Sequence, residues 1–158
     1  MRGMLRRLLS LIALAALGVS AAACGAPDPP PLDAACTGSP DAIERALARA
    51  PAPVTLPSGT RLSECVSHAR SDEELQTAGA ILSRAADDLA GRAQRGDPQA
   101  AIGLGYLVGA ARRGAKKTAG IHAELQRRVE SSARGLVDRG GQEATALERG
   151  LRAGEATG

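Results

Sequence analysis

The sequence has three cysteines and two histidines, residue types that bind transition metals or act as nucleophiles and general bases: Cys24, Cys36, Cys65, His68 and His122. Cys65 and His68 have C-x-x-H spacing and Cys36 could add a third ligand, but a tetrahedral zinc site needs a fourth. An enzyme would depend on His68 or His122, because no G-x-S-x-G or H-E-x-x-H motif occurs. His122 is expected at the partly exposed edge of an amphipathic helix. The sequence therefore predicts no metal, no cofactor and no enzymatic activity.

Cys24 follows a segment that has the layout of an export signal. Arginines at positions 2, 6 and 7 precede an uncharged apolar run, Leu8–Val19, and small residues come next. This order of basic, apolar and small residues is typical of cleaved signal peptides. The apolar run is about a dozen residues long, whereas a transmembrane helix needs about 20. We expect residues 1–23 to be removed.

The residues around Cys24, S-A-A-A-C-G from Ser20 to Gly25, resemble the lipobox of bacterial prolipoproteins. They depart from it at Ala21, where the family usually has Leu or a similar larger residue. The resemblance implies cleavage after Ala23 and attachment of acyl chains such as palmitate to Cys24, which anchor stably when there are two or three of them.

The protein would then lie on the extracytoplasmic face of a cell membrane. Gly25 does not match the Asp that commonly retains such proteins at the inner membrane, so the outer membrane is open in a two-membrane host. The alternative is ordinary signal-peptidase cleavage, which gives a freely secreted protein.

Lipidation of Cys24 would leave two cysteines, Cys36 and Cys65, in an oxidising compartment, where we expect them to form a disulfide. Closing a loop of about 30 residues would stabilise the fold by about 3–4 kcal/mol. The apolar core is thin, because Leu, Ile and Val make up 22 of the 135 residues from Cys24 onward, and Phe and Trp are absent. The disulfide is therefore expected to be a large part of the stability.

The chain divides into four predicted segments: a signal peptide at 1–23, a flexible Pro-rich tether at 24–35, a helical domain at 36–153 and a disordered tail at 154–158. The whole chain has 20 Lys and Arg against 17 Asp and Glu, and loss of the signal peptide removes three arginines, which leaves 17 of each sign. A net charge of zero gives no global field to attract nucleic acid. The expected partners are the membrane, through the lipid anchor, and another envelope protein.

Helix start signals and apolar periodicity predict an all-α fold, a small antiparallel bundle of three main and two minor helices. Ser39 and Pro40 begin a minor helix that Pro51 ends, and a capping box, S-D-E-E, begins a main helix at Ser71. The remaining expected elements are an irregular or hairpin segment at 51–62, the end of the first main helix near residue 95, a buried main helix starting at 97–98, a main helix at 118–139 and a minor helix at 142–153.

The buried helix carries Ala101, Gly105 and Gly109 four residues apart on one face. These small residues should let a neighbouring backbone approach closely, although each glycine costs up to about 1 kcal/mol of helix stability relative to alanine. We expect this helix to be the centre of the bundle, because it has no charge before Arg112.

Within this helix, G-D-P-Q-A-A-I-G-L-G-Y from Gly96 to Tyr106 weakly resembles one Sel1 or tetratricopeptide-type repeat, which implies at most a helix-pair interaction module. The predicted function is that of a non-catalytic envelope lipoprotein with a protein-interaction or structural role. The alternative is a small-ligand binder with a pocket among the helices near Tyr106, Arg112 and Arg113.

Overall fold

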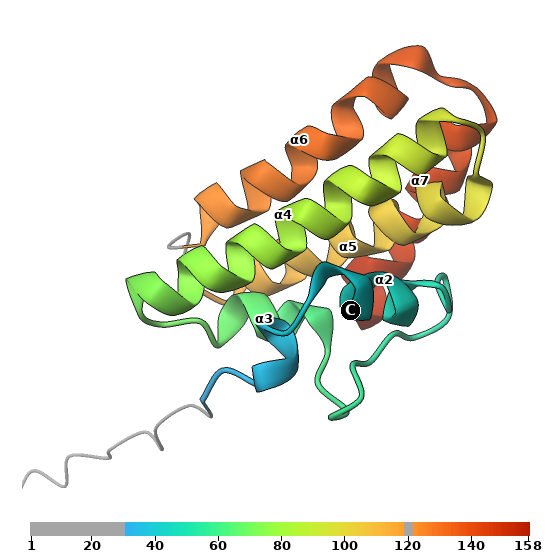
Figure 1. Ribbon diagram of the computed structural model, residues 1–158. Helices are drawn as coiled ribbons and strands as arrows, with labels where there is room; N and C mark the ends of the chain where they lie inside the picture. Colours follow the sequence, from blue (N-terminus) through green and yellow to red (C-terminus); the bar gives the residue numbers. More distant parts are fainter. Residues whose placement is uncertain (1–30, 119–121) are drawn as a thin grey trace, which may run out of the picture.

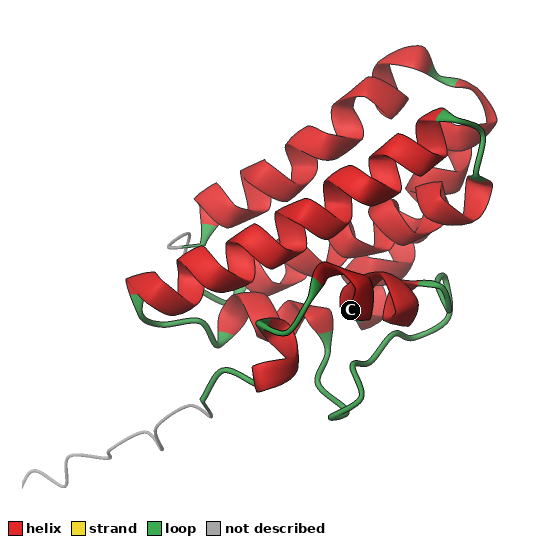
Figure 2. Cartoon of the chain, in the orientation of Figure 1, coloured by secondary structure: helices red, strands yellow, loops and turns green. Residues whose placement is uncertain are grey.

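The computed structural model describes residues 31–118 and 122–158 (Figure 1). The predicted signal peptide, Cys24 and most of the tether lie outside the described residues. The elements are η1 (Ala34–Cys36), α2 (Pro40–Leu47), α3 (Leu62–Ser67), α4 (Asp72–Gln94), α5 (Pro98–Lys116), α6 (Ala123–Arg139) and α7 (Gly141–Thr157). Figure 2 shows helices joined by loops throughout this part of the chain, and the predicted all-α bundle is confirmed.

The predicted helix starts are confirmed by their caps. Ser39 accepts from the backbone N–H of Ala42 in front of α2, which has proline in its first turn. Ser71 and the side chain of Glu74 form the reciprocal capping box of α4. Asp97 accepts from two backbone N–H groups at the start of α5. These caps satisfy donors that an isolated helix end would leave without partners.

The predicted irregular segment between α2 and α3 is a loop. In the second half of this loop, Thr55 and Arg61 form an isolated antiparallel bridge. A backbone hydrogen bond from Leu56 N to Thr60 O closes the turn at 2.8 Å. Gly59 has a φ of +89° at the tip, a conformation that glycine adopts without strain.

α5 is the central helix, as its apolar sequence predicts. It contacts α3, α4, α6 and α7, and every residue from Ala100 to Ala111 is buried. α4 and α6 contact each other as well as α5, and Figure 1 shows them side by side. Among the described residues, no helix is long and apolar enough to cross a membrane.

The end of the chain differs from the prediction, because α7 is longer than expected. A minor helix at 142–153 and a disordered tail at 154–158 were predicted, but α7 continues to Thr157 and Gly158 is buried. Gly140 and Gly141 have φ of +67° and +85°, so the chain reverses directly from α6 into α7. The last turn is ordered because it packs along α5, a contact that the sequence of α7 alone does not show.

Four glycines form the contact between these two helices, which we call the α5–α7 seam: Gly105 and Gly109 of α5, and Gly150 and Gly154 of α7. A Cβ atom on Gly105 would overlap the carbonyl oxygen of Leu147, and one on Gly109 that of Leu151. Cβ atoms on Gly150 and Gly154 would overlap the carbonyl oxygens of Ile102 and Tyr106 in the same way. The close backbone approach predicted for Gly105 and Gly109 is therefore confirmed, and it is reciprocal. Residue numbers rise together along the contact, so α5 and α7 run parallel.

Candidate functional site

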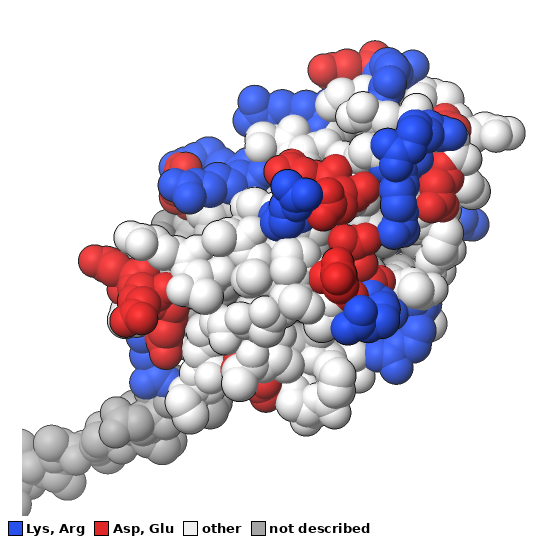
Figure 3. Space-filling model, in the orientation of Figure 1, with Lys and Arg blue, Asp and Glu red and all other residues white. Residues whose placement is uncertain are grey.

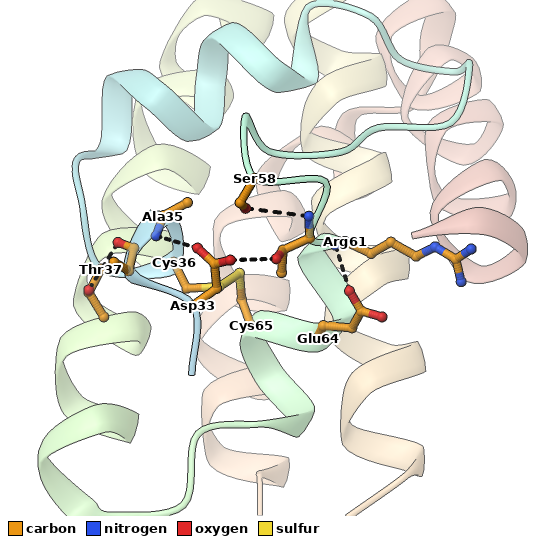
Figure 4. The surroundings of a disulfide bond; sticks show 10 residues. Asp33, Ala35, Cys36, Thr37, Ser58, Arg61, Glu64 and Cys65 are labelled. Carbon is orange, nitrogen blue, oxygen red and sulfur yellow. Dashed lines mark hydrogen bonds between the residues drawn. A yellow bond between two sulfur atoms is a disulfide. The ribbon is translucent and has the colours of Figure 1, made fainter. Parts of the chain in front are cut away.

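Cys36 and Cys65 form the predicted disulfide, with an S–S distance of 1.97 Å and a Cα–Cα distance of 5.3 Å. Both residues are fully buried, and the bond joins η1 to α3 (Figure 4). Their sulfur atoms are engaged with each other and are not available as thiolate ligands. His68, the third residue of the considered metal site, is the C-cap of α3.

Polar contacts surround this disulfide in what we call the N-terminal clasp, residues 33–37 and 58–65. Asp33 accepts from Ala35 N at 2.7 Å and from the Thr60 hydroxyl at 2.7 Å. These hydrogen bonds, first that of the Ala35 backbone, lower the pKa of Asp33. On the other side of the disulfide, Glu64 accepts from Arg61 N at 2.8 Å (Figure 4). The clasp thus holds η1 against the loop that precedes α3 and against α3 itself.

Tyr106, the centre of the ligand pocket considered from the sequence, is fully buried. Its hydroxyl accepts from Val54 N at 3.0 Å and shares a hydrogen bond with the Thr157 hydroxyl at 3.0 Å. A ligand could reach this ring only if α7 or the loop between α2 and α3 moved away. Tyr106 joins three segments of the fold, and its position does not favour a role in binding.

Arg112 and Arg113 lie near the C-terminal end of α5, and their side chains bind residues of α6 and α7. Arg112 bonds the carboxylates of Glu130 at 2.7 Å and Glu155 at 3.4 Å. The hydrogen bond to Glu130 is the largest influence on Arg112 and raises its pKa. Arg113 donates to the carbonyl oxygens of Glu155 and Ala156, at the C-terminal end of α7, where a cation is favoured. Both arginines therefore attach the last helix to the centre of the bundle.

His122 corrects the expectation of a partly exposed histidine within a helix. It is 5% exposed and is the N-cap residue of α6, which begins at Ala123 rather than at 118. Its Nε2 lies 2.7 Å from the carbonyl oxygen of Ala69, in the connection between α3 and α4. Its Nδ1 is buried and has no hydrogen-bond partner among the described residues. The sequence could not reveal this burial, because Ala69 is distant along the chain.

Two adjoining hollows, of about 130 and 280 Å³, lie between α4 and α6. Both are lined by Gln76, Gly79 and Arg128; His122 lines the smaller hollow and Ser83 the larger. We call the two together the α4–α6 groove. The Ser83 hydroxyl, like His122 Nδ1, is a buried polar atom without a partner in the described part of the chain. The sequence analysis missed this groove, and the one signal that we find for it is Gly79, a glycine in the interior of the helix α4.

Charged side chains of both signs are interspersed on the face shown in Figure 3. Several form ion pairs, of which Arg84–Asp88 (3.1 Å) lies within α4 and Arg92–Glu44 (2.9 Å) joins α4 to α2. Arg128 and Glu124 pair at 3.1 Å within α6, beside the groove. Hydrogen bonds from Arg127 and Arg128 lower the pKa of Glu124.

No family model, curated protein or solved structure matches this chain.

Proposed function

We propose that this chain is a bacterial envelope lipoprotein, anchored by acyl chains on Cys24, whose helical domain has a non-catalytic role in contact with another envelope protein. The main support is the pairing of the cysteines. Cys36 and Cys65 form a fully buried disulfide, which leaves Cys24 as the one cysteine outside it. Structural disulfides persist in oxidising compartments and are rare in the cytosol. The pairing therefore supports export, and the small residues before Cys24 support lipidation.

The length of the tether also supports anchoring. The described fold begins at the cap residue Asp33, and the interval from Cys24 to Asp33 contains four prolines. Nine residues span at most about 30 Å when fully extended. A lipid on Cys24 would hold the domain close to the membrane surface, where the partners available to it are other envelope proteins.

The lipid anchor is tested by the intact mass of the protein extracted from membranes of the native host, measured before and after reduction. We expect a chain that begins at Cys24, carries acyl chains and gains two hydrogens on reduction. A Cys24→Ala variant should lose the acyl mass and leave the membrane fraction. An unacylated chain beginning near Cys24 would overturn the anchor and leave a secreted protein.

The contact with another envelope protein requires a separate experiment. Chemical cross-linking in intact cells should join the wild-type chain to a discrete partner, and the Cys24→Ala variant, which is not held at the membrane, should give much less of this product. Absence of any product above the Cys24→Ala level would contradict the interaction role while leaving the anchor untouched.

A further inference from the structure

We propose that the domain docks on the membrane through one surface, residues 45–61, which we call the 45–61 face. The partner is a bilayer that contains anionic lipids, and the phosphate of one headgroup occupies the hollow between α2 and the loop that follows it. This proposal rests on the lipid anchor proposed above and adds the orientation of the domain. It is carried by the position of the loop, by its lack of charge and by the arginines that flank it.

The position of the loop keeps the 45–61 face near the bilayer. Asp33, at the start of the described fold, accepts from the Thr60 hydroxyl at 2.7 Å and so lies against this loop. The nine residues from Cys24 to Asp33 reach at most about 30 Å, whereas the 23 residues of α4 are about 35 Å long. Figure 1 shows α6 on the opposite side of the domain from the loop. A lipid on Cys24 therefore keeps the loop, rather than α6, within reach of the membrane surface.

The loop itself offers an exposed surface without charge. No residue from 50 to 60 is charged, and three prolines are among the exposed residues of this segment: Pro51, Pro53 and Pro57. In Figure 3, the area where Figure 1 places this loop consists mostly of uncharged atoms. An uncharged loop can lie among lipid headgroups without the cost of removing ionised side chains from water.

Arginines flank the loop on both sides. Residues 45–61 contain Arg45, Arg49 and Arg61 and no acid, and all three arginines are exposed. Within residues 31–118 and 122–158, none of the three forms an ion pair, and Arg49 donates to the carbonyl oxygen of Thr55. Several arginines of α4 and α6, by contrast, pair with acids of their own helix. The charges of the 45–61 face are therefore available to an anionic surface, which attracts such side chains.

The hollow between α2 and the loop fits one lipid phosphate. Its volume is about 520 Å³, and it is lined by Arg45, Arg49 and otherwise by uncharged residues of the two segments. Because both arginines are exposed, their N–H groups can be reached from outside, and guanidinium groups bind phosphate through paired hydrogen bonds. The acids of α2 do not oppose this, since Asp41 does not line the hollow and Glu44 pairs with Arg92 at 2.9 Å.

The test places a single tryptophan in the chain, which contains none. Pro57→Trp reports from the 45–61 face, and Val137→Trp, at an exposed residue of α6, is the matched control. The oxidised, acylated proteins are added to vesicles of phosphatidylcholine and phosphatidylglycerol that include a lipid with a nitroxide on its headgroup. The nitroxide should quench the fluorescence of Pro57→Trp strongly and that of Val137→Trp weakly. Ala52→Trp, in the same loop, is a second reporter and should behave like Pro57→Trp.

Charge variants made in the Pro57→Trp protein test the arginines. Arg45→Gln combined with Arg49→Gln should lower the ratio of docked to undocked protein about 25-fold, because each arginine near an anionic surface contributes about fivefold. Arg134→Gln combined with Arg139→Gln removes the same charge from exposed positions of α6 and should leave the quenching unchanged. Added salt, or vesicles of phosphatidylcholine alone, should weaken the quenching of the unmodified face. Equal quenching of the two double variants would contradict the phosphate site.

The failure of the docking and the failure of the anchor give different results. Chains that carry no acyl mass and do not float with the vesicles would overturn the anchor and this proposal with it. Acylated chains that float with the vesicles, but in which the loop and α6 tryptophans are quenched equally, would overturn the docking alone. The 45–61 face would then be free for a protein partner.

Discussion

The α5–α7 seam and the N-terminal clasp each attach a segment of the chain to a core that is poor in large residues. They do so by different interactions. The seam has no covalent bond and uses glycines to bring two helix backbones into direct contact. The clasp contains only a 3-10 turn, a loop and the short helix α3, and a disulfide with surrounding hydrogen bonds holds these together. In the seam, two long helices are held together by close packing of their backbones. In the clasp, the elements are short, and a disulfide holds them together instead.

The largest expected effect comes from removing the cross-link of the clasp. Replacing both Cys36 and Cys65 with serine should lower the free energy of unfolding by about 3–4 kcal/mol, because the unfolded chain gains the freedom of a loop that the bond closes over a sequence separation of 29. Urea denaturation of the oxidised wild type and of the double variant measures this difference. A loss below about 1 kcal/mol would mean that the polar contacts of the clasp hold it without the disulfide.

The next largest effect should come from adding one methyl group to the seam. Gly154→Ala should destabilise the protein by about 3 kcal/mol, because the new Cβ atom overlaps the backbone of α5 at Tyr106 and forces the helices apart. Gly135→Ala on the exposed side of α6 is the control, since a Cβ atom there meets only Gln94 at 3.7 Å. It should be neutral or stabilising by up to about 1 kcal/mol. Equal effects of the two substitutions would show that the seam is not closely packed.

A smaller effect is expected from the charge of Asp33 in the clasp. Its pKa lies below the ordinary value of 3.8 because Ala35 N and then Thr60 donate to the carboxylate. A lowered pKa stabilises the fold above the unfolded value, and this contribution disappears as the pH falls through the folded pKa. Between about pH 5 and pH 3, the wild type should therefore lose stability more steeply than Asp33→Asn. Parallel denaturation curves for the two proteins over this range would show that Asp33 does not stabilise the clasp.

The two regions also differ in how well the sequence predicts them. The sequence predicts the Cys36–Cys65 disulfide because these are the two cysteines that remain when Cys24 is set aside. It predicts the helix caps at Ser39, Ser71 and Asp97 because each cap depends on a few neighbouring residues. Gly105 and Gly109 predicted a close neighbour without identifying it. The last helix was predicted to end at residue 153, but it continues to Thr157 because it packs along the facing helix α5, which its own sequence does not show.

The candidate binding residues were the hardest to predict for the same reason. Tyr106, Arg112 and Arg113 are types that often bind ligands, but here their partners are Val54, Thr157, and carboxylates and carbonyl groups of α6 and α7. His122 and Ser83 face a groove that exists only once α4 and α6 are packed. Such sites require the distances between elements, which a single sequence does not contain.

Hydrogen exchange in the native state, measured before and after reduction of the disulfide, tests most directly whether seam and clasp are held independently. Reduction should lower the free energy of opening more for amides of α2 and α3 than for those of α5 and α7, because the clasp can detach while the seam stays closed. An equal decrease in all four helices would contradict this account and would show that the clasp and the seam unfold as one unit.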